Sequence, residues 1–244
     1  MRAHAVIFTL CAHWVLRRES GAVVPLQEDN KNKMKQDLLQ PKNGWAVPAG
    51  ARLPVPPAAQ RGLMFRTVSQ VSRWFGRAQL PNIFPVLNTN GRIFWAWLFF
   101  ASRLMPYGRL PAATREKIIL RVAWNCRSRY EWAQHLELAQ KVGVSDAEVL
   151  QLTLPVAEIK EPYWAAVYAA CDSLCAKEAI SDAVWNQLAE EHTDKELIEI
   201  LVLAGHYEMV AGVLINAKVP LEADIEENFQ RFQARCCGDA LTTN

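Results

Sequence analysis

The residues with the clearest chemical potential lie in the segment NCRSRYEWAQH, positions 125 to 135. Glu131 and His135 are four positions apart, so on a helix they share one face and lie within reach of each other. A carboxylate beside an imidazole is suited to general acid–base catalysis near neutral pH. Ser128 lies three positions before Glu131 and shares that face, whereas Cys126 points elsewhere on a helical path. The spacing therefore favours a carboxylate–histidine site over a thiol site.

Glu116 is a second carboxylate that this site can use. It precedes Glu131 by 15 positions, which is about 22 Å along a straight helix, so the two meet only if the chain turns between them. The segment from Asn125 to Ser128 predicts that turn, with Ser128 as the N-cap of a new helix and Glu131 in capping-box spacing. Two structural alternatives stay open: a capping box without catalysis, and Glu116 as a solvated surface charge.

Composition excludes several classes of protein. The 244 residues have a net charge of +2, with 51% hydrophobic and 21% charged residues, as in an ordinary soluble protein without a basic field for nucleic acid. The six cysteines include no C-x-x-C and no evenly spread framework. We therefore expect reduced thiols, a cytoplasmic protein and no nucleic-acid partner.

The pattern after residue 60 predicts an all-α fold. Apolar residues recur every three or four positions, turn signals separate the segments, and no stretch alternates with a period of two. The apolar segment 93–105 is too short to span a bilayer, so we expect a buried core helix there and no membrane association. The other expected helices cover 62–77, 111–124, 130–143, 145–152, 162–181, 181–193 and 194–220.

A faint internal repeat has an offset of 77 residues. Tyr130-Glu131 recurs as Tyr207-Glu208, and Lys141-Val142 recurs as Lys218-Val219. We expect two related helix pairs packed around a shared centre. The position equivalent to His135 is Gly212, so only one copy can carry histidine chemistry.

The chain divides into four parts. Residues 1–33 are expected to be a disordered tail or a mis-assigned start, and a signal peptide is the lesser alternative. Residues 34–61 contain five prolines between positions 41 and 57, which predicts an extended segment. A helical domain is expected over residues 62–228, followed by a C-terminal tail over 229–244.

A family resemblance covers roughly residues 62 to 225. The stretch LPAATREKIILRVAWNCRSRYEWAQHLELAQKVGVSDAEV resembles the carboxymuconolactone decarboxylase and AhpD-like alkylhydroperoxidase family, and ELIEILVLAGHYEMVAGVLINAKVPLE resembles its closing helix pair. The hydroperoxidase branch has a Glu, then C-x-x-C, then a His. Glu116 and His135 match the Glu and the His, but the cysteine positions hold Ser128 and Glu131. A Glu four residues before the His is typical of the decarboxylase branch.

The resemblance implies an AhpD-like helical bundle and a decarboxylase acting on a small carboxylated lactone or oxo-acid. In it His135 would move the proton, Glu131 would orient His135, and Glu116 would act as base or position a carboxylate. Ser128, Trp124 and Trp132 are the expected substrate-binding residues. We expect no metal and no cofactor, because no second His shares the face of Glu131 and His135. The family also implies a homo-oligomer. Two alternatives remain, hydroperoxidase activity and a non-catalytic ligand-binding relative.

Overall fold

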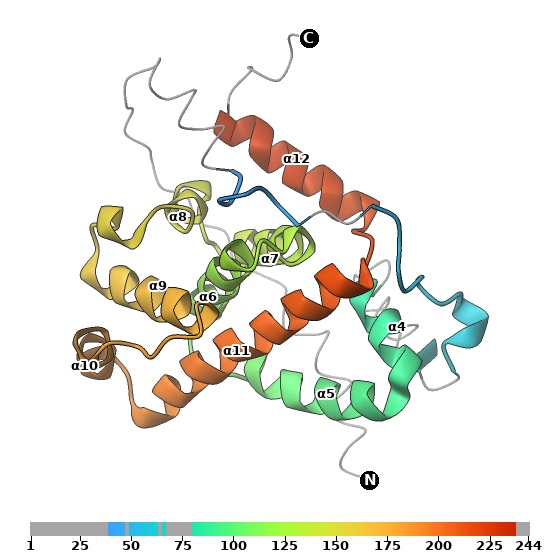
Figure 1. The fold of residues 1–244 in the computed structure, drawn as a ribbon, viewed down its shortest axis with the longest axis horizontal. Helices are drawn as coiled ribbons and strands as arrows, with labels where there is room; N and C mark the ends of the chain where they lie inside the picture. Colours follow the sequence, from blue (N-terminus) through green and yellow to red (C-terminus); the bar gives the residue numbers. More distant parts are fainter. Residues whose placement is uncertain (1–38, 47–48, 63–64, 67–79, 238–244) are drawn as a thin grey trace.

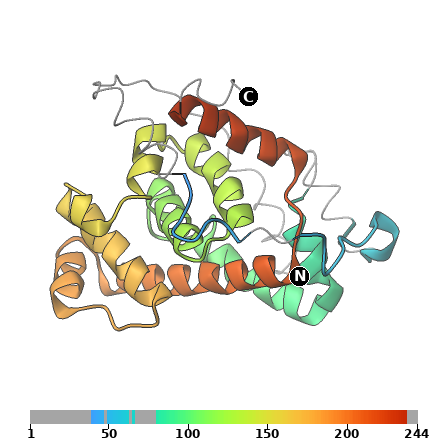
Figure 2. The same ribbon diagram turned by 45° about the horizontal axis from the view of Figure 1, so that its top comes forward.

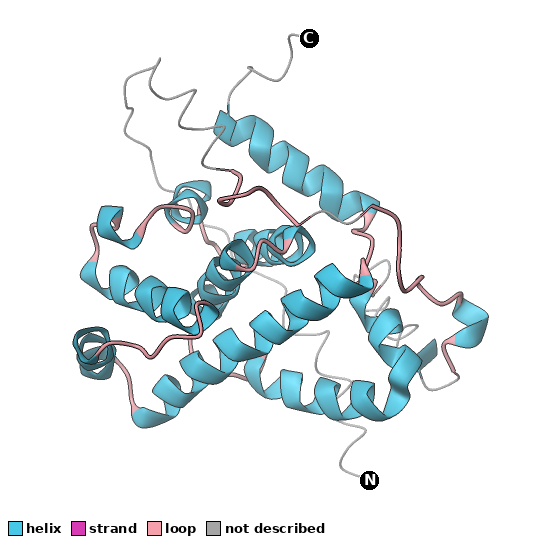
Figure 3. Cartoon of the chain, in the orientation of Figure 1, coloured by secondary structure: helices cyan, strands magenta, loops and turns pink. Residues whose placement is uncertain are grey.

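A computed structural model describes residues 39–46, 49–62, 65–66 and 80–237. Helices and loops make up all of these residues, and they contain no strand, which confirms the predicted all-α class (Figures 1 and 3). The elements are η1 (Ala58–Gln60), α4 (Ile83–Leu87), η2 (Asn88–Asn90), α5 (Gly91–Leu104), α6 (Ala112–Asn125), α7 (Arg129–Lys141), α8 (Asp146–Gln151), η3 (Val156–Glu158), α9 (Pro162–Cys175), α10 (Asp182–Glu191), α11 (Asp194–Ala217) and α12 (Ala223–Cys237). The expected tail 1–33 and most of the expected helix 62–77 lie outside the described residues.

Helix α6 lies at the centre of the fold. It packs against α7, α9 and α11, and α12 covers the outer side of α7. Figure 2 shows α6 and α7 between α12 and the long helix α11. Every residue of α6 from Thr114 to Trp124 is buried. A charged residue in this part of the helix is therefore inside the protein, so Glu116 is not a solvated surface charge.

The proline-rich segment joins the core through an aromatic cluster. Trp45 contacts the rings of Trp124, Trp132 and Phe229 at centroid distances of 5.4, 5.6 and 6.3 Å. Its indole N–H also donates to the carbonyl of Leu39. The described residues between 39 and 57 form no helix or strand, yet this cluster fastens them to α6, α7 and α12.

The expected C-terminal tail was wrong over most of its length. Helix α12 continues through residue 229 to Cys237, and Phe229 and Phe232 are fully buried in the core. Burial of two phenylalanine side chains contributes several kcal/mol, which is enough to hold an amphipathic helix against α7. The helical domain therefore extends beyond residue 228.

The two copies of the internal repeat differ in backbone. The first copy breaks between α6 and α7, where Arg127 has a φ of 60°. The equivalent positions in the second copy, residues 202–205, lie inside the continuous helix α11. Val-Leu-Ala-Gly can continue a helix, and no residue there has a positive φ. The second copy is thus one long helix rather than the expected helix pair.

Helix α5 is an edge helix rather than the expected buried core helix. Only Phe94, Ser102 and Leu104 are buried on it, whereas Ile93 and Phe99 are more than half exposed. Helix α11 has the length and apolar composition of a membrane span, but half of that apolar stretch is buried inside the protein. Its buried side packs on α6 and α9, as expected of a central helix in a folded domain.

We propose that exposed apolar side chains of α5 and α11 form a contact between copies of this chain, since Phe99 is 56% and Met209 45% exposed. The protein should sediment as a homo-oligomer at micromolar concentration. Phe99→Glu or Met209→Glu should shift it towards the monomer, because a charge would be buried in the contact. Arg231→Glu, an exposed position on α12, is the control. A monomeric parent at high micromolar concentration would contradict the proposal.

Candidate functional site

A three-residue reversal brings α6 and α7 side by side. Arg127 adopts the left-handed conformation, the Ser128 N–H donates to the Ala123 carbonyl at 2.8 Å, and the Arg127 N–H donates to the Trp124 carbonyl at 3.0 Å. These bonds form a Schellman motif, which closes the C-terminus of a helix. Ser128 is at the same time the N-cap of α7, as predicted. The carboxylate of Glu116, on the second turn of α6, is thereby returned to the middle of α7.

Glu116 and His135 form the central pair of the site. His135 Nδ1 lies 2.7 Å from Glu116 Oε2, Glu116 is fully buried, and His135 is 9% exposed. A carboxylate can only accept, so Nδ1 donates the hydrogen and Nε2 is left to exchange a proton with a bound molecule. The second oxygen of Glu116 is buried without a hydrogen-bond partner. The surface-charge alternative for Glu116 is therefore wrong.

Glu131 has a different environment from Glu116. It is 1% exposed, and neither of its oxygens has a hydrogen-bond partner. Burial raises the pKa of the Glu131 carboxyl well above its usual range, and the nearby Ser128 hydroxyl lowers it in part. The carboxyl is thus held in its neutral form over a wider pH range than an exposed one.

Two expectations for this segment were wrong. The side chain of Ser128 makes no capping hydrogen bond to α7, so the capping box with Glu131 does not form. The imidazole of His135 is held by Glu116 rather than by Glu131. Helical spacing places Glu131 on the same face of α7 as His135. The rotation of α7 against α6 nevertheless points His135 across the helix interface, towards Glu116.

Helix α11 supplies two aromatic residues to the site. The ring of Tyr207 lies edge-on to His135 at 4.8 Å and edge-on to His206 at 5.1 Å. Burial raises the pKa of Tyr207 well above its usual range, and the charges of Glu116 and Glu131 add to this effect. Both carboxyl groups therefore act on the same phenol.

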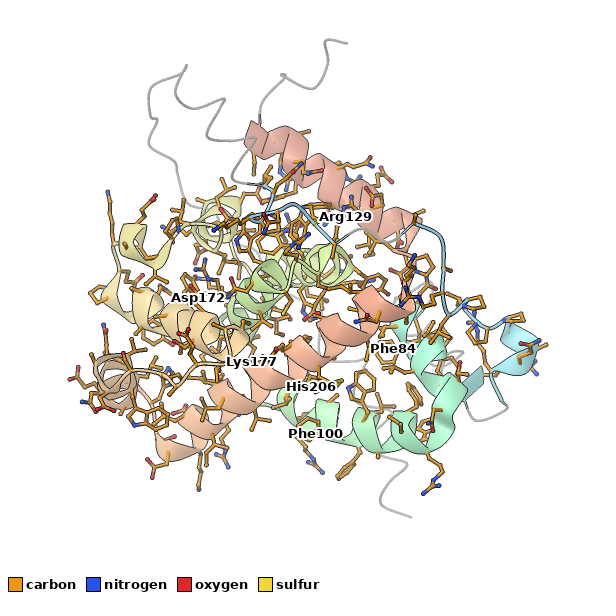
Figure 4. The ribbon with its side chains drawn as sticks, viewed as in Figure 1. Phe84, Phe100, Arg129, Asp172, Lys177 and His206 are labelled. Atoms are coloured by element: carbon orange, nitrogen blue, oxygen red, sulfur yellow. The ribbon has the colours of Figure 1, made fainter. Side chains whose placement is uncertain are left out.

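His206 connects the site to α5. Its ring stacks on Trp97 at 6.0 Å and contacts Phe100 at 5.4 Å, and Figure 4 shows His206 on α11 facing Phe100 on α5. Its Nδ1 is buried without a partner. Sequence reasoning did not assign Tyr207 or His206 to the acid–base site, although the repeat had paired Tyr207-Glu208 with Tyr130-Glu131.

The three expected substrate-binding residues separate in the structure. Ser128 lines a pocket of about 270 Å³ between the start of α7 and the end of α11, together with Tyr130, Leu214 and Lys218. Trp124 and Trp132 are packed in the core against Trp45 and do not line this pocket. Their burial indicates a packing role. Among the described residues, no group of His, Cys, Asp and Glu side chains is arranged to hold a metal ion.

Comparisons with known proteins agree with this fold. Residues 92–174 match the carboxymuconolactone decarboxylase family. The fold is similar to an alkylhydroperoxidase AhpD core, an uncharacterized peroxidase-related protein from Ralstonia eutropha JMP134, with a TM-score of 0.64 and 18% identity over 72% of this chain and 94% of that chain.

A second structural relative is the debrominase Bmp8. A cysteine-to-alanine variant in complex with 2,3,4-tribromopyrrole has a TM-score of 0.56 and 13% identity, over 63% of this chain and 83% of that chain. The apo form gives the same TM-score and identity, over 63% and 84%. No curated protein matches the chain significantly. At these identities the structures establish the fold, and the matched segment contains Glu116, Glu131 and His135.

The stability of the fold should depend on the protonation of His206. Burial lowers the pKa of His206 to about 4, and the nearby His135 adds to this effect. The unfolded chain therefore binds a proton that the folded chain does not bind between pH 6.5 and 4. The free energy of unfolding should decrease as the pH falls through this window, by on the order of 3 kcal/mol.

The comparison for this prediction is His206→Phe, which keeps a ring beside Trp97 and cannot titrate. Glu131 contributes the opposite slope, because its raised pKa makes the folded chain bind the extra proton. The difference between parent and variant in urea unfolding at pH 7, 5.5 and 4.5 isolates His206. An identical pH dependence in both proteins would contradict the assignment.

Proposed function

We propose that this chain, whose residues 92–174 identify it with the carboxymuconolactone decarboxylase family, is a decarboxylase-like enzyme that acts by acid–base chemistry on a small carboxylated lactone or oxo-acid. The observation that carries the proposal is the buried hydrogen bond between Glu116 and His135, at 2.7 Å. An imidazole whose one nitrogen is fixed by a carboxylate presents the other nitrogen in a defined direction. Such a pair is the arrangement that proton transfer requires.

The proposed roles follow from the two carboxyl environments. His135 Nε2 takes or returns the substrate proton, and Glu116 stabilises the imidazolium that forms when His135 holds it. Glu131 is the proposed acid, since burial raises the pKa of its carboxyl and keeps it protonated to higher pH than an exposed one. Two carboxyls in different environments can take separate base and acid functions at one pH.

The charge that develops in the reaction also needs a partner. Loss of CO₂ leaves the electron pair of the broken bond on an enolate-like oxygen, and proton return to carbon completes the reaction. The first turn of α7 has no side-chain cap, so its backbone N–H groups and helix dipole favour an anion. Lys218 lines the pocket that Ser128 also lines, and it adds a positive charge for a substrate carboxylate.

The size of the described pocket favours a small substrate. Ser128 lines it and lies seven residues before His135 on the same helix, about 10 Å along α7. A pocket of about 270 Å³ is at the lower limit for small-molecule sites. We place the enzyme in the cytoplasm, since Cys126, Cys171 and Cys175 are free thiols.

The first test of this function concerns His135. His135→Gln should lower turnover by about 10²–10⁴-fold, because the variant cannot transfer the proton. It should stay folded, since Gln is a good helix former and its amide can donate to Glu116. The measurement is CO₂ release and substrate loss across a panel of small carboxylated lactones and oxo-acids.

Two controls make this result specific. His192→Gln changes a histidine that bonds Tyr163 on another side of the fold, and Cys171→Ala changes a buried thiol. Both variants should keep turnover. Undiminished turnover by folded His135→Gln, or loss of turnover in the thiol variant, would contradict the acid–base proposal. A panel in which only hydroperoxides react would favour the hydroperoxidase alternative.

Glu131→Gln gives a second test, with stability and activity moving in opposite directions. The variant removes a carboxyl that keeps its proton in the folded chain, whereas the unfolded chain releases it above about pH 4.5, so the parent loses stability as the pH rises and the variant does not. Above neutral pH the variant should therefore unfold at a higher urea concentration than the parent, while turnover falls because the acid is lost. Equal unfolding midpoints at pH 6 and pH 9 would show that Glu131 does not carry a raised pKa.

A further inference from the structure

Two buried polar atoms between α5 and α11 have no hydrogen-bond partner within the described residues. They are the indole Nε1 of Trp97 and the ring Nδ1 of His206. His206 is only 7% exposed, and an indole N–H can only donate. Because buried polar groups are paired in nearly all native proteins and a buried donor is costly to leave unpaired, two such atoms on neighbouring rings point to a ligand.

The two rings belong to one aromatic cluster. His206 stacks on Trp97 at 6.0 Å with an angle of 15° between the ring planes, and it contacts Phe100 at 5.4 Å. Phe84 lies against Trp97 at 5.7 Å, and Figure 4 shows Phe84, Phe100 and His206 where α4, α5 and α11 meet. Apolar walls with a few placed polar atoms are typical of small-molecule sites.

Tyr207 connects this cluster to the acid–base site. Its ring lies edge-on to His206 at 5.1 Å and edge-on to His135 at 4.8 Å, and His135 is bonded to Glu116. A continuous series of contacts therefore runs from the buried carboxylate to Trp97. A molecule held by Trp97 and His206 lies one ring away from the imidazole to which we assign proton transfer.

The chemistry of the two atoms selects the group that binds. Trp97 offers one N–H donor. Burial lowers the pKa of His206 to about 4, and the nearby His135 adds to this effect, so His206 is neutral at pH 7 and its Nδ1–H tautomer offers a second donor. A carbonyl oxygen has two lone pairs and can accept from both. An ionised carboxylate would lose its hydration among the aromatic rings and gain only neutral donors.

We propose that Trp97 and His206 form a subsite that binds an uncharged carbonyl oxygen of the substrate, such as that of a lactone ring. The inference rests on the proposed function for the identity of the substrate, whose carboxylate is assigned to Lys218 and the start of α7. The two ends of a carboxylated lactone are then recognised by different chemistry, and the bond to the carbonyl orients the ring against His135.

The test is NMR of isotope-labelled full-length protein titrated with γ-butyrolactone at pH 7. The indole resonance of Trp97 and the imidazole resonance of His206, assigned by their loss in Trp97→Phe and His206→Phe, should shift as the lactone binds. Tetrahydrofuran, the same ring without the carbonyl, should shift neither.

The variants give the size of the effect. Trp97→Phe keeps an aromatic ring and removes the donor, so the dissociation constant of the lactone, followed at His206, should rise about three- to tenfold. Trp95→Phe, on the same helix, is the matched control and should bind the lactone as the parent does. Thermal unfolding of each variant verifies that it is folded.

Several results would overturn the subsite. Resonances that stay unmoved at every lactone concentration would leave the two atoms to ordered water only. Equal shifts with tetrahydrofuran would show an apolar gap that does not recognise a carbonyl, and tighter binding of tetrahydrofuroate at the same resonances would show a site for charge.

The outcome separates the subsite from the proposed function. Lactone binding at Trp97 and His206 without turnover of any lactone or oxo-acid would contradict the function and support the subsite. Turnover that Trp97→Phe and His206→Phe both leave unchanged would contradict the subsite and support the function.

Discussion

The reversal between α6 and α7 is the constraint on which the site depends. Ser128 ends one helix as the last residue of a Schellman motif and begins the next as its N-cap, so the two helices are joined with no spare residue. Arg127 must adopt the left-handed conformation, which costs a non-glycine residue about 1–2 kcal/mol. Its side chain offsets this cost by donating to the carbonyls of Gly44 and Asn43 at 2.6 and 2.8 Å.

The extended segment before the helical domain therefore has a structural role, which is to stabilise the turn between α6 and α7. The N–H of Ala46 donates to the carbonyl of Arg127 at 2.9 Å, and Trp45 packs on Trp124 and Trp132 on either side of the turn. These contacts pack the extended segment against the turn and hold its backbone conformation. Because the pair Glu116–His135 spans the two helices joined there, a change in the turn would move the two partners relative to each other.

Sequence reasoning recovered the parts of the site that depend on local spacing. The all-α class, the N-cap at Ser128 and the return of Glu116 follow from periodicity and from the reach of a helix. The partner of His135 could not be obtained this way, because it depends on how α7 is rotated against α6. Tyr207 and His206 come from a helix that begins more than 50 residues later. The helix α12 could have been found, since Phe229 and Phe232 lie three positions apart in an otherwise polar segment.

The surroundings of Glu131 connect its protonation to a neighbouring helix. Glu131 lies at the start of α7, and Cys175 is the last residue of α9. A negative charge on Cys175 raises the pKa of Glu131, and by the reciprocity of electrostatic coupling an ionised Glu131 disfavours the Cys175 thiolate. The protonation of the buried acid therefore depends on a side chain that lies outside the pair Glu116–His135.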